Sequence, residues 1–291
     1  MSELVGAPVI ARNESDLSIH DPERAKALGF RGSAVAGIFH MDCFAPLMLE
    51  AYGEDWWRRG GLSLYFLNIV VSGEPVQAVA QRPSSPGALT HIHARRADDP
   101  SITVASGTAS LNDHAHHDLM KRDLRLTDQS RLRLLKGVHP GALVGERTHV
   151  VEARKHDAQI ASGGINQDMA FYHGASPWGG PIASISQAAS LMVRLGHDNG
   201  HSGLVHLAPD SDKADGMYGA CQLVFVNGPI FLDRPYKVRG TVIGVGESPK
   251  TEYCWWDATA HDEKGVEVAR VRHLLRFIKA GSPLYPELKA A

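Results

Sequence analysis

The fold is decided by residues 19–52, which read IHDPERAKALGFRGSAVAGIFHMDCFAPLMLEAY. The stretch begins with a polar turn that contains His20 and Asp21, and a second turn follows at residues 29–32, with glycine at its first and last positions. The chain then enters a run from Ala34 to Tyr52 with apolar side chains on nearly every face. A helix without a wide polar stripe is buried on all sides, as when a sheet wraps around it. The run therefore predicts one long, buried central helix.

Individual residues in this stretch also predict where its two helices begin, end and bend. Asp21 is a good N-cap, and Pro22 occupies the first helical position, where its missing N–H is harmless. Together they predict a short helix that ends at Gly29. In the longer helix, Pro46 removes one backbone donor, so we expect a bend there.

From Leu62 onward the apolar residues recur every second position, which predicts strands separated by Gly, Pro and Asp turns. The alternating sets are Leu62, Leu64 and Phe66, then Val76, Ala78 and Ala80, then Thr90, Ile92 and Ala94, then Ile102, Val104 and Ser106. A first strand at residues 9–11, a long buried helix and several antiparallel strands make an α+β unit of about 110 residues.

The same plan returns in the second half of the chain. Five segments match in the same order, and this order is stronger support for a repeat than any single match. The matching pairs are 9–16 with 150–157, 34–52 with 182–195, 66–68 with 225–227, 73–76 with 233–238, and the strands 90–111 with 253–277. The sequence predicts a tandem duplication: an N-terminal unit at 1–112, a linker at 113–140, a C-terminal unit at 141–282 and a tail at 283–291. The loop at 196–219 has no long counterpart, and we expect a lid, an interface element or disorder there.

Composition and charge exclude several classes of protein. Apolar residues make up 43% and charged residues 21%, as in a globular protein, and 30 Lys and Arg nearly balance 32 Asp and Glu. The near-zero net charge creates no strong electrostatic field that would favour binding to nucleic acid or to an anionic membrane. The sequence also contains no run of about 18 apolar residues that could span a bilayer. The N-terminus lacks a secretory pattern, and the three cysteines are scattered without a CxxC spacing. We therefore expect a cytoplasmic protein with reduced thiols and no nucleic-acid or membrane partner.

Motifs for cofactors and metals are missing from the sequence. It contains no GxGxxG after a strand, no P-loop and no GxSxG, so hydride transfer, phosphoryl transfer and serine hydrolysis have no support. The histidines at 91, 93, 114, 116 and 117 have no accompanying Cys or carboxylate pattern that completes a metal site. We expect neither a cofactor nor a metal.

A buried helix wrapped by an antiparallel sheet and duplicated in one chain resembles the double hot-dog fold. The first half also resembles the hydration motif of MaoC-like, (R)-specific enoyl-thioester hydratases. The residues that carry this resemblance are His20, Ala25, Phe30 and Val35-Ala36-Gly37, followed by Phe66, Leu67 and Ser72-Gly73-Glu74-Pro75-Val76. The resemblance covers about the first 110 residues at motif level and the second half only in layout.

The sequence departs from the family pattern at three points. Ser15 stands where the pattern has its catalytic Asp, with Asp16 one residue later and Glu14 one residue earlier. The His that precedes the corner glycine in the pattern is Ala36 here, and the spacing from His20 to Phe30 is one residue shorter. The chain is therefore identified as a divergent member.

The resemblance implies reversible addition of water across the double bond of a 2-enoyl thioester carried by coenzyme A or a carrier protein, or of a similar conjugated carbonyl compound. His20 is the expected general acid and base, partnered by Asp16 or, failing it, Glu14. The Gly37 N–H at the helix start is the expected donor to the enolate oxygen, and the missing Cβ would let a thioester approach. Further substrate-binding candidates are Ala36, His40 and Arg31.

Alternative interpretations stay open at this point. His20 also fits a surface or capping histidine, Asp16 fits a turn carboxylate, and His40 fits either a pocket wall or a buried structural hydrogen bond. Two other functions fit the same fold: an acyl-thioester hydrolase, and a non-catalytic acyl-ligand-binding or scaffold protein. The resemblance implies that one half keeps catalysis while the other shapes the substrate tunnel. We also expect a homodimer, because the edges and faces of such sheets usually pair.

Overall fold

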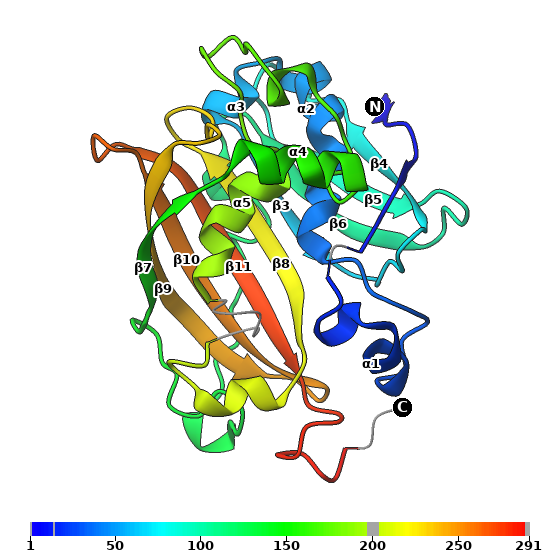
Figure 1. The fold of residues 1–291 in the computed structure, drawn as a ribbon, viewed down its shortest axis with the longest axis vertical. Coiled ribbons are helices and arrows are strands. Elements are labelled where there is room, and N and C mark those ends of the chain that lie inside the picture. The colour runs from blue at the N-terminus through cyan, green and yellow to red at the C-terminus, as the bar shows by residue number, and fades with distance from the viewer. Residues whose placement is uncertain (1, 14, 197–203, 289–291) are drawn as a thin grey trace.

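The computed structural model describes residues 2–13, 15–196 and 204–288 of the chain (Figure 1). Glu14 and part of the 196–219 loop therefore lie outside the described residues. The helices are α1 (Pro22–Ala27), α2 (Ala45–Tyr52), α3 (Trp56–Arg59), α4 (Ala153–Ser162) and α5 (Ile185–Val193). The 3-10 helices are η1 (Ser18–His20), η2 (Gly37–Phe44), η3 (His114–His116), η4 (Gln129–Arg131), η5 (Ala170–Tyr172), η6 (Arg194–Gly196) and η7 (Pro209–Lys213).

All the strands in the described ranges belong to one antiparallel sheet, with the order β1-β4-β5-β6-β3-β8-β11-β10-β9-β7 and β2 beside β4. The first-half strands are β1 (Glu3–Val5), β2 (Val9–Ile10), β3 (Gly61–Phe66), β4 (Pro75–Gln81), β5 (Thr90–Arg96) and β6 (Thr103–Ser110). The second-half strands are β7 (Leu143–Val150), β8 (Gly216–Phe225), β9 (Pro235–Glu247), β10 (Thr251–His261) and β11 (Glu267–Ile278). The order 4-5-6-3 is mirrored by 9-10-11-8, and the two halves join where β3 pairs with β8.

Small details repeat between the halves as well. Asn68 and Asn227 follow matching strands, and each donates a side-chain hydrogen bond of 2.8 Å to a backbone carbonyl, of Thr103 and of Glu267 respectively. The helix entrances repeat too, with isolated bridges Ala34–Val71 and Ile182–Phe231. The two halves therefore share one plan, while the boundaries at 112 and 141 remain predictions.

The central segment of the first half is helical and buried as expected, but the prediction of one helix starting at Ala34 is wrong. Ala34 is in a bridge to Val71, the helix starts at Gly37, and residues 37–44 are 3-10 rather than α. Pro46 gives a local reason for the change. It cannot donate to the carbonyl of Asp42 four residues back, and the Ala45 N–H bonds that carbonyl instead, three residues back. The α-helix α2 begins at this point.

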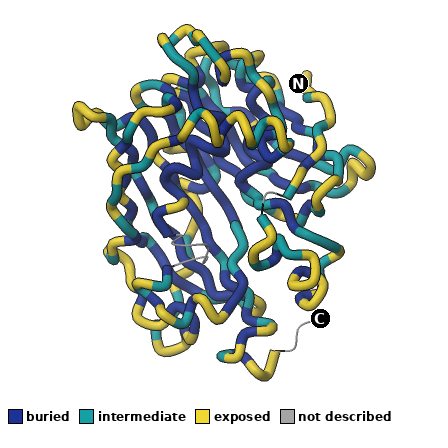
Figure 2. Tube along the Cα trace, in the orientation of Figure 1, coloured by how far each residue is buried: buried dark blue, intermediate teal, exposed yellow. Residues whose placement is uncertain are grey.

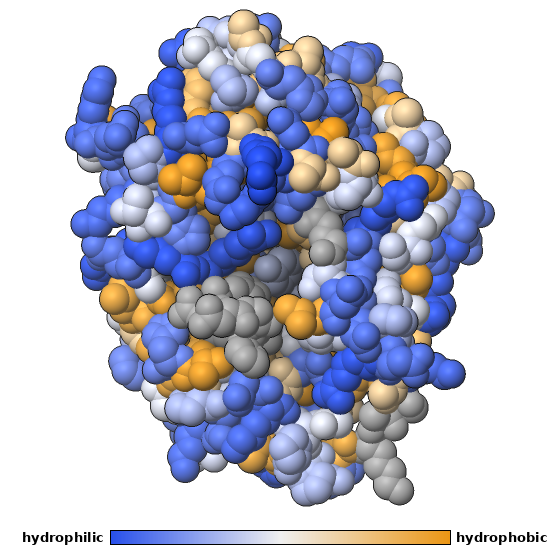
Figure 3. Space-filling model, in the orientation of Figure 1, coloured by the Kyte–Doolittle hydropathy of each residue, from blue (hydrophilic) through white to orange (hydrophobic). Residues whose placement is uncertain are grey.

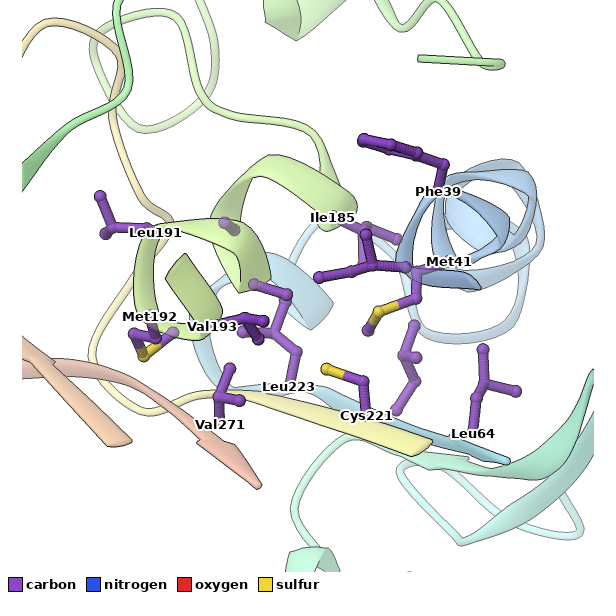
Figure 4. Packing of buried hydrophobic residues seen from close by; sticks show 14 of the residues in the cluster. Phe39, Met41, Leu64, Ile185, Leu191, Met192, Val193, Cys221, Leu223 and Val271 are labelled. Atoms are coloured by element: carbon purple, nitrogen blue, oxygen red, sulfur yellow. The ribbon is translucent and has the colours of Figure 1, made fainter. Parts of the chain in front are cut away.

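The core lies between the sheet and the two central helices. Both η2 and α5 pack on the same face, and α4 lies across them (Figure 1). Phe39 and Met41 of η2 lie beside Ile185 of α5, above Leu64 and Cys221 of the sheet (Figure 4). Burial is concentrated in these helices and in the middle of the strands (Figure 2). All three cysteines are buried free thiols, as the sequence predicted.

The linker at 113–140 covers the other face of the sheet and then joins the core. It contains η3 and η4 and is otherwise irregular. Leu119 packs with Trp255 and Leu274, while Leu132, Leu134 and Leu135 enter the main core. The buried carboxylate of Glu252 accepts the backbone N–H groups of Arg133, Leu134 and Leu135 at 2.7, 3.0 and 2.8 Å. These contacts hold the linker in place.

Within the described ranges, every helix is too short or too polar to cross a bilayer. The face drawn in Figure 3 is mostly hydrophilic, with apolar residues scattered over it. Scattered apolar side chains are ordinary on protein surfaces. The expected homodimer remains a prediction.

Candidate active site

A cavity of about 380 Å³ lies between the two halves, within the usual range for ligand pockets. Its first-half wall comes from Ser15 and from residues 17–20, 34–40 and 66–70. The second half contributes Gln159, Ser190 and Arg194 from the helical layer, together with residues 216–218 and Leu275. The cavity therefore brings together four of the predicted site residues, His20, Ala36, Gly37 and His40.

The backbone around His20 is held by local hydrogen bonds. Asp21 caps α1 by accepting the Arg24 N–H at 2.7 Å, as its sequence context predicted. Asn13 donates its side-chain amide to the His20 carbonyl at 2.7 Å, and the Ala34 N–H donates to the Ile19 carbonyl at 3.0 Å. The turn before α1 is thus tied to the strand-like segment that leads into η2.

The His20 ring has a defined orientation. Its Nδ1 lies 2.6 Å from the carbonyl oxygen of Ala34. A carbonyl oxygen only accepts, so Nδ1 carries the proton and Nε2 of the neutral ring is left as an acceptor. Burial lowers the pKa of His20, and the hydrogen bond to Ala34 opposes this in part. His20 is therefore a neutral base, held in one tautomer, at the wall of the cavity.

Asp16 is not among the residues that line the cavity. It is exposed, whereas its neighbour Ser15 lines the wall and accepts the Leu17 N–H at 3.1 Å. The orienting partner of His20 in the described residues is the Ala34 carbonyl. Arg31 also lies outside the lining, with an exposed guanidinium paired to Glu74. Asp16 and Arg31 therefore do not share the cavity lining with the two histidines and the helix corner.

Gly37 is the first residue of η2, after an extended Ala36 with φ −61° and ψ 129°. The first N–H groups of a helix have no acceptor within the helix, so the Gly37 N–H is available to a ligand. A Cβ on Gly37 would lie 2.7 Å from Cγ of Phe66. The Phe66 ring therefore fills the space that a Cβ would occupy, and the approach of a thioester to this backbone remains a prediction.

His40 and Asp42, two residues apart, point to different sides of η2. His40 lines the cavity with 2% of its surface exposed, and its Nδ1 has no hydrogen-bond partner among the described residues. Burial lowers the pKa of His40 to about 4. Asp42 is fully buried and accepts the N–H and the hydroxyl of Ser186 at 2.7 and 2.5 Å. Of the two, His40 belongs to the cavity and Asp42 to the contact between the halves.

No family model and no curated protein sequence matches the chain. Solved structures do match over nearly its whole length. A Mycobacterium tuberculosis protein with a double hotdog fold is 10% identical, covers 96% of this chain and 97% of its own, and has a TM-score of 0.61. A MaoC domain protein from Chloroflexus aurantiacus is 12% identical over 95% of each chain, with a TM-score of 0.58. A MaoC-like dehydratase is 11% identical over 94% and 97%, with a TM-score of 0.53.

The chain has the double hot-dog fold. This confirms the fold class predicted from the duplicated buried helix, and the fold is the one that MaoC-like dehydratases share. At 10–12% identity the likeness concerns the fold alone. The chemistry of this double hot-dog therefore has to be inferred from its own residues.

The two halves of this double hot-dog differ at the position of His20. The Ile182 N–H donates to the Phe171 carbonyl at 3.1 Å, just as the Ala34 N–H donates to the Ile19 carbonyl. This match places Tyr172 where the first half has His20. Tyr172 is fully buried, with its ring 5.3 Å from that of His156. Aromatic side chains fill the second-half equivalent of the site, and no sequence motif signalled this because the matching residues share no chemistry.

The remaining polar clusters provide no metal centre. Among the residues that the structure describes, no group of three or more His, Cys, Asp and Glu side chains is arranged to hold a metal ion. His117 is buried against the Ser110 hydroxyl at 2.8 Å, and His91 is exposed on β5. His173 pairs with Asp157 and Asp168 at the surface.

Proposed function

We propose that this chain is a hydro-lyase that adds water reversibly to the double bond of a 2-enoyl thioester, with coenzyme A or a carrier protein as the thiol. The observation that carries the proposal is the His20 ring, held by the Ala34 carbonyl at 2.6 Å in a cavity that also contains the helix corner at Gly37. A base with a free Nε2 and a nearby backbone donor are the two groups that hydration requires.

Hydration proceeds in two proton transfers through His20. A water bound at Nε2 attacks the β-carbon while its proton passes to the imidazole. The electron pair of the carbon–carbon double bond forms a new double bond between the α-carbon and the carbonyl carbon, and the carbonyl π pair moves onto the oxygen to give an enolate. The imidazolium then returns a proton to the α-carbon, which regenerates the neutral ring. Dehydration follows the same path in reverse.

His20 and the Gly37 N–H both lower the activation barrier for hydration. General acid–base catalysis of this kind contributes on the order of 10²- to 10⁴-fold in rate. A backbone donor such as the Gly37 N–H, aimed at the developing oxyanion, contributes on the order of 10²- to 10³-fold. The carboxylate partner predicted at Asp16 or Glu14 is not required in this scheme, because the Ala34 carbonyl sets the tautomer of His20.

The test is incubation with crotonyl thioester and with longer 2-enoyl thioesters. Hydration removes the absorbance of the conjugated enoyl group without freeing thiol. His20→Ala should abolish it, while His91→Ala, which replaces an exposed histidine outside the cavity, should leave it unchanged.

Other outcomes of this assay would contradict the proposal. Release of thiol would identify an acyl-thioester hydrolase. Binding without either signal would support the non-catalytic alternative. Hydration that survives His20→Ala at full rate would place the reaction elsewhere.

A further inference from the structure

A second histidine lines the cavity and takes no part in the proton transfers above. His40 is the other imidazole among the residues around the cavity, and only 2% of its surface is exposed. A polar side chain on so apolar a helix needs a partner or a function, because burying an unpaired polar group is unfavourable. The described residues provide no partner for its Nδ1.

The helix type determines where His40 lies. Residues 37–44 form a 3-10 helix, in which side chains three positions apart are eclipsed. His40 therefore lies on the same side of η2 as Gly37, one turn further into the molecule. In an α-helix, with 3.6 residues per turn, the two positions would be offset by about 60°. The 3-10 geometry thus places the His40 side chain on the side of η2 where Gly37 borders the cavity.

The chemistry of a buried neutral imidazole limits what His40 can do. Desolvation disfavours the charged form, so the ring presents one N–H donor and one nitrogen acceptor. The Cys43 thiol contacts the backbone carbonyl of His40, not the ring. A neutral imidazole N–H is suited to polarise a carbonyl group rather than to transfer a proton to carbon.

We infer that His40 is a second catalytic residue, which donates its N–H to the thioester carbonyl oxygen beside the Gly37 N–H. This inference rests on the proposed function and makes it more specific. Two fixed donors, one backbone and one side chain, receive the charge that develops on the oxygen when water adds to the β-carbon. No proton is transferred by His40, so His20 remains the only acid and base.

The first experiment measures hydration of crotonyl thioester by His40 variants. His40→Leu removes the donor and should lower kcat on the order of 10²- to 10³-fold with little change in KM, because the hydrogen bond strengthens in the transition state. His40→Gln keeps an N–H donor and should retain most of the activity. His117→Leu is the matched control, since it also removes a buried histidine but lies outside the cavity. It should lower stability while the folded fraction keeps its kcat.

The second experiment does not depend on turnover. Crotonyl thioester labelled with ¹³C at the carbonyl is bound to His20→Ala, and the carbonyl stretch is recorded by infrared difference spectroscopy. The stretch should lie at lower frequency than for the free thioester, and the double variant His20→Ala/His40→Leu should show a smaller shift, because only the Gly37 N–H donor remains.

The two experiments separate the inference from the proposed function. If His40→Leu changes neither kcat nor the carbonyl stretch, the inference is wrong while hydration by His20 stands. If the native protein does not hydrate the thioester but His40→Leu still reduces the carbonyl shift, the proposed function fails and the donor role stands. If no thioester binds in the cavity, both are overturned.

Discussion

The buried Asp42 carboxyl predicts an unusual dependence of stability on pH. Burial raises its pKa to about 7 from 3.8, and the hydrogen bonds from Ser186 oppose this only in part. Between these values the folded state holds a proton that the unfolded state has lost. The free energy of unfolding contributed by Asp42 is therefore fully present below pH 3.8 and falls as the pH rises towards about 7.

The size of the change in the free energy of unfolding follows from the shift in the pKa of Asp42. A change of about 3 pKa units, at about 1.4 kcal/mol per unit, sets an upper limit on the order of 4 kcal/mol. Buried histidines act in the opposite direction. Burial lowers the pKa of His40 and of His156 to about 4 and that of His117 to about 3, so their contribution to stability is lost as the pH falls below 6.5. The free energy of unfolding of the native protein, measured as a function of pH, therefore contains both contributions.

The assay isolates Asp42 by difference. Urea unfolding of the native protein and of Asp42→Asn is measured from pH 4 to pH 8, and the two free energies of unfolding are subtracted at each pH. Asn cannot ionise, so the native protein should lose stability relative to Asp42→Asn as the pH rises. Ser186→Ala, which removes the hydroxyl donor but keeps the backbone N–H, should extend the window to higher pH. A difference that stays constant from pH 4 to pH 8 would show that the folded-state pKa of Asp42 is not raised.

Three further predictions concern the helix corner, the base and the linker. Gly37→Ala should lower the free energy of unfolding in urea by about 1–3 kcal/mol, because its Cβ would lie 2.7 Å from Cγ of Phe66. Phe66→Leu in the same chain should recover part of this loss. An unchanged urea midpoint in Gly37→Ala would contradict this packing. The profile of kcat/KM against pH should rise through a midpoint below 6.5, since burial lowers the pKa of His20, and a midpoint above 6.5 would speak against a buried base. Glu252→Gln should speed amide hydrogen exchange at residues 133–135, whose N–H groups it accepts; unchanged protection would mean that other contacts hold the linker.

Much of the fold could be predicted because its signals are local or repeated. The cap of α1 at Asp21 and Pro22, the period-two strands and the Phe-x-Asn turns at 66–68 and 225–227 all depend on residues a few positions apart. Repetition in one order then makes a duplicated domain the simplest explanation. The corner at Gly37 and the turn at His20 line one cavity, while their roles, which the family resemblance implies, remain predictions.

The partner of His20 could not be predicted in the same way. A motif counts positions along the chain, and it suggested Asp16 or Glu14 from spacing alone. In the structure Asp16 is exposed and the Ala34 carbonyl, fourteen residues from His20, orients the ring instead. A backbone carbonyl has no sequence signature, so no pattern could have indicated it.

The sequence by itself determined the duplicated α+β plan and the burial of the central helix, because periodicity and turn residues record which groups must avoid water. Only the tertiary structure decided three further points. Residues 37–44 form a 3-10 helix, which places His40 in the cavity; Asp42 bonds Ser186, 144 residues away; and Tyr172 fills the second-half equivalent of the site. Each of these three features depends on which buried side chains of the two halves contact one another. The sequence pattern predicts that a residue is buried, but not which residues it contacts.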